Sequence, residues 1–185
     1  MKSQLCAISL LALAAACGQQ ASNTAEAPAP APGEAPMAPV TAAVTPADFV
    51  QTIANSDRFE IESSGLAATN AIRADVKEFA RMLVTAHTTT SREVATLAPQ
   101  IQLTPPTPAL SAEQTEEVTE LRGKAGEEFD DAYLDAQIEA HENAITLFQN
   151  FITTSADGPL KQWAQTTLPK LQQHLDRARQ LDTAT

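Results

Sequence analysis

The chain is poor in the residues that would hold an exported protein together covalently. It has only two cysteines, Cys6 and Cys17, in 185 residues. A framework of disulfide bonds is therefore excluded, and the fold must be held by a buried core. Hydrophobic residues make up 43% of the chain but aromatic residues only 4%. The expected core is consequently aliphatic and rich in alanine.

Basic residues are also scarce, with 12 Lys and Arg against 23 Asp and Glu and a formal net charge of −11. Nucleic-acid binding requires a basic surface that neutralises phosphates, so this class of partner is excluded. Direct docking of the domain on anionic lipid is disfavoured for the same reason.

The chain lacks an apolar run long enough for a transmembrane helix. The uncharged stretch from Leu5 to Ala16 follows Lys2 and is shorter than the roughly 20 residues that span a bilayer. A positive start, an apolar middle and small residues before a break predict a secretory signal over residues 1–16. Small residues directly before a cysteine are similar to the bacterial lipoprotein signal, which implies lipidation of Cys17. An ordinary signal peptide is the alternative.

A lipid on Cys17 would make the membrane a partner of the protein and anchor it to the cell envelope. Gly18 rather than Asp follows the cysteine. This favours the outer membrane, facing the periplasm, in a cell with two membranes. Residues 17–45 are dominated by alanine and proline without apolar periodicity, so they predict a disordered tether.

Helical periodicity begins at Pro46 and predicts one all-α domain over residues 46–182. Caps, glycines and prolines divide it into long helices over 46–70, 71–98, 127–155 and 159–181, with a short polar helix over 111–121. The proline-rich segment that follows the second long helix cannot be helix interior. We therefore expect a four-helix bundle with one long crossover between helices 2 and 3, as in ferritin-like folds. A helical bundle of another topology is the alternative.

Each of the three histidines falls on the apolar stripe of a different helix. His87, His141 and His174 all occur in steps of three and four residues between aliphatic side chains, and Glu60 lies on the inward face of the first helix. Distances from the turns place all four at similar depth. They predict either a metal site built from imidazole and carboxylate, or a structural layer of hydrogen-bonded polar groups. Glu-x-x-His pairs, which di-iron bundles use, are absent because Val84, Ile138 and Leu171 precede the histidines by three.

The spacing of these residues resembles the bacterial domain-of-unknown-function family 4142. The positions that carry the resemblance are Phe59-Glu60-Ile61, Phe79-Ala80-Arg81-Met82, His87-Thr88, Phe129-Asp130, Tyr133, Gln137, His141, Trp163-Ala164, Leu168-Pro169 and His174-Leu175. The resemblance implies a ferritin-like bundle in an exported protein, but no established activity. It singles out Asp130 and Tyr133 as supporting polar residues beside Glu60 and the histidines. Members often have Asp before the second-helix histidine, where this chain has Ala86.

The sequence therefore predicts an envelope lipoprotein without enzymatic activity, whose centre of Glu60, His87, His141 and His174 binds one divalent ion of zinc, iron or manganese. The alternative is a module that binds an envelope protein partner and whose histidines are structural. A metal-dependent redox enzyme is a third interpretation.

Overall fold

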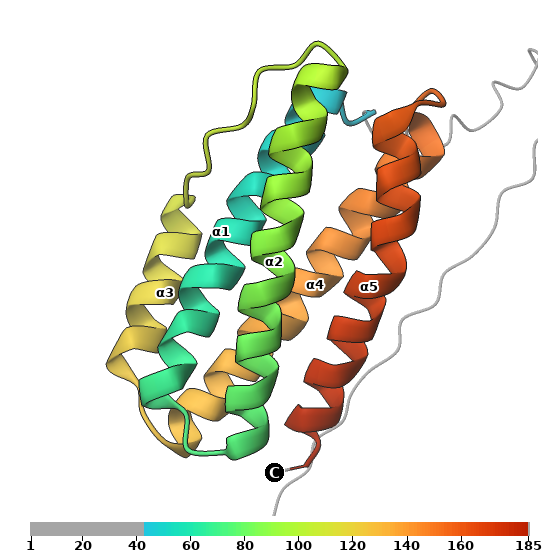
Figure 1. The fold of residues 1–185 in the computed structure, drawn as a ribbon. Helices are drawn as coiled ribbons and strands as arrows, with labels where there is room; N and C mark the ends of the chain where they lie inside the picture. Colours follow the sequence, from blue (N-terminus) through green and yellow to red (C-terminus); the bar gives the residue numbers. More distant parts are fainter. Residues whose placement is uncertain (1–42, 185) are drawn as a thin grey trace, which may run out of the picture. The chain divides into compact units, whose positions relative to one another are not determined.

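The computed structural model describes residues 43–184, and all of its regular secondary structure is α-helical. The helices are α1 (Pro46–Asn70), α2 (Ala74–Gln100), α3 (Ala112–Gly123), α4 (Glu127–Thr154) and α5 (Pro159–Asp182) (Figure 1). The all-α prediction is confirmed, and the five helices of the described residues include the short polar helix predicted over 111–121. The predicted signal, Cys17 and most of the predicted tether lie outside the described residues.

Local capping sets where several of the helices begin. The hydroxyl of Thr45 accepts a hydrogen bond from the amide of Asp48 and caps α1. Ser111 and Gln114 form a capping box at the start of α3, as their spacing predicts. Gly126 precedes α4 with a φ of 67°, a left-handed conformation that glycine adopts without strain. Its amide donates to the carbonyl of Asn70, which ties α4 to the end of α1.

The predicted bounds of the second helix are wrong at both ends. It begins at Ala74 rather than Ala71 because residues 71 and 73 are extended, and the amides of Ile72 and Arg73 donate to the carboxyl of Asp130. It also continues through Pro99 to Gln100. A proline in the last turn removes only one hydrogen bond there, which the helix tolerates. The other ends differ from the prediction by one or two residues, within the normal fraying of helix ends.

The four long helices pack side by side in two hairpins. α1 packs on α2 and α4, and α5 packs on α4 and α2, while the short α3 lies against α1 and α4 (Figure 1). The crossover between α2 and α3 is held on α1 by Gln51 and Arg58, which donate to the carbonyls of Thr107 and Pro108. Among residues 43–184, no helix combines the length and hydrophobicity that a bilayer crossing requires.

The core consists of two apolar clusters separated along the helices. One contains Leu83, Leu134 and Ala178, and the other contains Val94, Phe148 and Leu171. On each of α2, α4 and α5 the histidine falls between a residue of one cluster and a residue of the other. The fold therefore places a polar layer between two apolar halves.

Candidate metal centre

Three imidazoles from three different helices meet in this polar layer. The ring of His87 on α2 lies 5.6 Å from that of His141 on α4 and 5.7 Å from that of His174 on α5, measured between centroids. The rings of His141 and His174 are 5.4 Å apart. The three rings thus form a nearly equilateral triangle. Each is edge-on or tilted to the others, so they do not stack and can direct ring nitrogens toward a common point.

One nitrogen of each ring converges with the others. These nitrogens all lie within 4.8 Å of one another, and the three histidines are the one group of potential metal ligands of this kind among residues 43–184. Metal–nitrogen bonds of about 2.0–2.1 Å keep two ligand nitrogens roughly 3.5 Å apart in a three-coordinate site. A closure of the rings by about 1 Å therefore brings them to bonding geometry.

His87 is oriented from behind by a carboxyl group that the sequence analysis did not identify. Its Nδ1 lies 2.8 Å from Oδ1 of Asp57 on α1. The other oxygen of Asp57 accepts a hydrogen bond of 3.0 Å from the hydroxyl of Ser91. Asp57 is 2% exposed, so this chain of contacts lies inside the protein. Carboxylates in this position are the usual outer partners of metal-binding histidines, because they fix the ring and raise the basicity of the opposite nitrogen.

His141 is oriented by its own helix. Its Nδ1 lies 2.8 Å from the backbone carbonyl of Gln137, one turn earlier on α4. A carbonyl can only accept, so Nδ1 carries the hydrogen and Nε2 presents a lone pair. Glu60 lies on the same Nδ1 side, with Oε1 at 3.5 Å. The side chain of Gln137 donates to Ser63, which holds the region between α1 and α4 together.

The nitrogens on the other side of these rings are buried without a partner. Nε2 of His87, Nε2 of His141 and Nδ1 of His174 make no hydrogen bond within the described structure. A buried polar atom without a partner costs about 1–3 kcal/mol. Three of them on neighbouring rings, two of which are oriented by Asp57 and Gln137, form a donor set that could hold a cation.

His174 is the most exposed of the three and supplies the route to solvent. It is half-buried, whereas His87 and His141 are buried. A groove between α2 and α5 reaches both His87 and His174, with Met82, Thr85 and Lys170 among its lining residues. The groove therefore reaches two of the three histidines from the surface of the bundle.

Burial sets the charge of the centre. It lowers the pKa of His87 to about 4, of His141 to about 3 and of His174 to about 4. Neighbouring imidazoles lower the pKa of the last two further, and Lys170 adds to the effect on His174. The rings are therefore neutral at pH 7, which is the form that binds metals.

The pKa values of the two carboxyl groups behind the rings, those of Asp57 and Glu60, shift in the opposite direction. Burial raises the pKa of Asp57 to about 8, and the charge of Glu93 adds to this. Burial also raises the pKa of Glu60 well above its usual value, and repulsion from Asp57 and Glu117 adds to it. A cation between the imidazoles would favour the ionised carboxylates and stabilise the whole layer.

The structure brings most, but not all, of the predicted site residues together. The three histidines converge, whereas Glu60 lies behind His141 and is not part of the converging group. Asp130 of α4 is buried beside the residues that precede α2, where it accepts from the backbone amides of Ile72 and Arg73. Tyr133 bonds to Ser64 at 2.8 Å. Asp130 and Tyr133 therefore support the bundle at one end rather than the centre.

The helical spacing of the sequence could have identified Asp57 as an inward-facing residue. It follows Ile53 by four residues and precedes Glu60 by three, so it shares their inward face. Residue 86, directly before His87, is alanine and offers the imidazole of His87 no carboxyl group. Asp57 supplies a carboxyl group to the same imidazole from the neighbouring helix.

Comparison with known proteins adds a family and a fold. The family model described as "Domain of unknown function (DUF4142)" matches residues 29–181. The solved structure of CopM in the Ag-bound form is similar over 72% of this chain and 92% of CopM, with 16% identity and a TM-score of 0.60. CopM in the Cu(II)-bound form is similar over 74% of this chain and 95% of CopM, with 14% identity and a TM-score of 0.63. At these identities the likeness shows the fold alone. No curated protein matches the chain.

Proposed function

The chain belongs to the domain-of-unknown-function family 4142, and we propose that it binds a transition-metal ion between His87, His141 and His174. The observation that carries the proposal is the set of three buried imidazole nitrogens that face one another without partners. In a purely structural layer, polar groups this deep would be expected to hydrogen-bond one another. Here the outer nitrogens of His87 and His141 have partners while the inner ones do not.

Copper and silver are the metals that this donor set favours. Three imidazoles without a carboxylate are better suited to copper or zinc than to manganese, which prefers oxygen ligands. Among divalent ions, copper binds such sites more tightly than zinc. The similar CopM structures hold Ag and Cu(II), which supports the same choice. The proposed copper or silver differs from the zinc, iron or manganese expected from the sequence.

The proposed role is capture of the ion at the cell envelope rather than catalysis. The imidazoles of His87 and His141 are buried, and the ion approaches through the groove that reaches His174. We take the four long helices as the ferritin-like bundle predicted from the sequence, with α3 added in the crossover. The signal-like residues 1–16 and Cys17 support export and lipid anchoring, with the domain facing the periplasm.

Metal titration of the full chain tests the function. We expect wild type to bind one Cu(II) or one Ag(I), measured by equilibrium dialysis with elemental analysis, and to melt at a higher temperature when loaded. His87→Gln, His141→Gln and His174→Gln should each lose most of the affinity, because two imidazoles hold an ion far less tightly than three. Gln172→Ala, an exposed residue of α5 that does not line the groove, is the matched control and should bind as wild type does.

The competing interpretations give different results. If the histidines form only a structural layer, excess copper, silver or zinc will leave the melting temperature unchanged, and the metal proposal is then wrong. Coupled losses in double variants would show that the three residues act as one site. Turnover of peroxide by the copper-loaded protein, lost in the histidine variants, would instead support the redox enzyme.

A further inference from the structure

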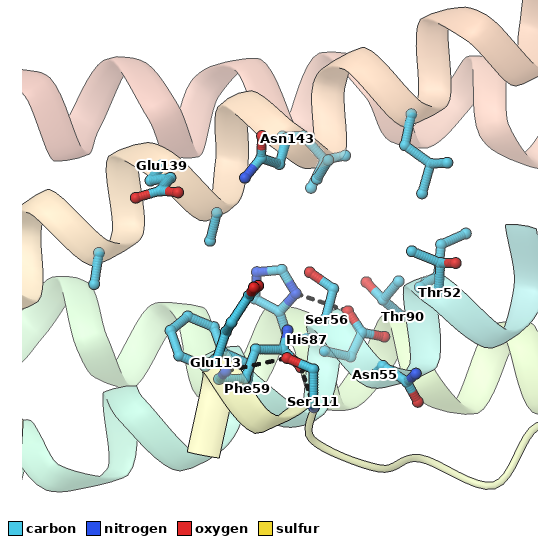
Figure 2. Close-up of a pocket in the computed structure, with 18 of the residues that line it drawn as sticks. Thr52, Asn55, Ser56, Phe59, His87, Thr90, Ser111, Glu113, Glu139 and Asn143 are labelled. Carbon is cyan, nitrogen blue, oxygen red and sulfur yellow. Dashed lines mark hydrogen bonds and ion pairs between the residues drawn. The ribbon is translucent and has the colours of Figure 1, made fainter. Parts of the chain in front are cut away.

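A second pocket lies on the other side of His87, between α1, α3 and α4. Its volume is about 420 Å³, within the range of roughly 300–1,000 Å³ typical of small-molecule sites. Figure 2 shows the His87 ring projecting into the middle of this space, with Glu139 and Asn143 on one side and Thr52, Ser56 and Glu113 on the other. This pocket shares His87, Thr90 and Leu171 with the groove between α2 and α5 that reaches His174, but its other lining residues are different.

Small side chains on α4 keep the pocket hollow. Ala136, Ala140 and Ala144 follow one another at four-residue spacing and line the same wall. Ile53 and Phe59 of α1 line the pocket as well. The walls are therefore largely apolar, and they suit the hydrocarbon part of a ligand.

The rim of the pocket is acidic. Glu113 and Glu117 of α3 and Glu139 of α4 are among its lining residues, and these residues include no lysine or arginine. The three glutamates have no hydrogen-bond or ion-pair partner within residues 43–184. Partial burial raises the pKa of Glu117, and repulsion from Glu139 and Glu120 adds to the shift. Negative charges that face one another without a counter-charge favour a cationic ligand.

The interior adds a buried polar group. His87 lines the pocket and is 4% exposed. Ser56 and Asn143 supply further hydroxyl and amide groups in the lining. Apolar walls with a few polar groups and one sign of charge at the mouth are the features of a site for an amphipathic small molecule.

We propose that this pocket binds an organic cation, an amine with an apolar tail. The ammonium group lies between Glu113, Glu117 and Glu139, and the tail lies against the alanine wall of α4. This site goes beyond the proposed metal function and needs no metal. The start of α3 opposes it, because a helix N-terminus attracts anions. That effect is weakened by the capping box, which already occupies the end, and by Glu113 in the first turn.

Three probes of equal length separate charge from hydrophobicity. Hexylamine, 1-hexanol and hexanoate are titrated into the metal-free full chain in the presence of a chelator, and binding is followed by calorimetry and by amide NMR shifts. We expect saturable binding of hexylamine, at least tenfold weaker binding of hexanol, and none of hexanoate. Shifts should be largest for the residues of α1, α3 and the middle of α4 that line the pocket, and for His87 and Thr90 of α2. Equal or tighter binding of hexanoate, or no saturable binding of hexylamine, would overturn the proposal.

Two kinds of variant test the two halves of the site. Glu117→Gln combined with Glu139→Gln should reduce hexylamine affinity at least tenfold, whereas Glu116→Gln, an exposed residue of α3 outside this pocket, should leave it unchanged. Ala140→Leu should fill the hollow and abolish binding while helicity is retained. If Ala140→Leu does not fold, Ala144→Val serves the same purpose. Hexylamine that binds a folded, filled variant as tightly as wild type would show that it binds elsewhere.

Discussion

Oδ1 of Asp57 on α1 lies 2.8 Å from Nδ1 of His87 on α2, and both residues are buried. This contact directs the opposite nitrogen of His87 toward His141 and His174. It makes α1 part of the centre although α1 contributes none of the three imidazoles. The proposed site is therefore built by all four long helices.

Asp57→Asn should weaken metal binding while the bundle remains folded. The amide preserves the shape of the side chain but not the charge that supports a metal-bound imidazole. Loss of such an outer partner typically costs about 10–100-fold in metal affinity. Competition with a chelator of known affinity measures the change, and Asp135→Asn, exposed on α4, is the control. Unchanged affinity in Asp57→Asn would show that the contact serves folding only.

The stability of the metal-free protein should be greatest near pH 6.5. Burial lowers the pKa of all three histidines to about 4 or below, whereas an unfolded chain takes up these protons near pH 6.5. The contribution of the three neutral histidines to the free energy of unfolding is therefore complete above pH 6.5. It is lost as the pH falls toward 4, at up to about 1.4 kcal/mol per histidine per pH unit.

The buried carboxyl groups have the opposite dependence. Burial raises the pKa of Asp57 to about 8 and that of Glu60 in the same direction, so their contribution is lost as the pH rises from about 4 toward 8. Below pH 6.5 the three histidines change the free energy of unfolding with pH more than the two carboxyl groups do, so stability rises with pH. Above pH 6.5 only the carboxyl groups change it, so stability falls. Urea denaturation from pH 4.5 to 8.5 tests this, and Asp57→Asn should flatten the alkaline side. A stability that rises steadily up to pH 8.5 contradicts the prediction.

Asp130→Ala should destabilise the protein by about 1–3 kcal/mol without changing its metal affinity. The carboxyl group of Asp130 is 1% exposed and accepts from the amides of Ile72 and Arg73, which are left without that partner in the variant. Chemical denaturation measures the loss, and Asp131→Ala, an exposed neighbour, should cost much less. A large fall in metal affinity in Asp130→Ala would place this residue in the centre after all.

Cys17→Ser should release the protein from membranes or leave its signal uncleaved. The reason is that acyl chains on Cys17 would be the anchor in the proposed lipoprotein. Cell fractionation and intact-mass measurement of wild type and variant provide the readout. A mature wild-type protein with an unmodified Cys17 rules out the lipid anchor.

Local sequence signals predicted most of the helices because caps, prolines and glycines act within one turn of chain. The capping box at Ser111 and Gln114 is an example, and it is present in the structure. The start of the second helix was misplaced because the groups that keep Ile72 and Arg73 out of the helix come from Asp130, far along the sequence. No local pattern around Ala71 carries that information.

The sequence by itself determined that the three histidines face inward, since each lies on the apolar stripe of its own helix. Which carboxyl group meets which imidazole was decided only by the tertiary structure. Asp57 and Glu60 are three residues apart, which is roughly one turn or about 4.5 Å along α1. Depth estimated from distant turns is no more accurate than that, so the sequence could not choose between them. The axial register of α1 against α2 makes the choice, because packing in the two apolar clusters brings Asp57 to Nδ1 of His87 and leaves Glu60 behind His141.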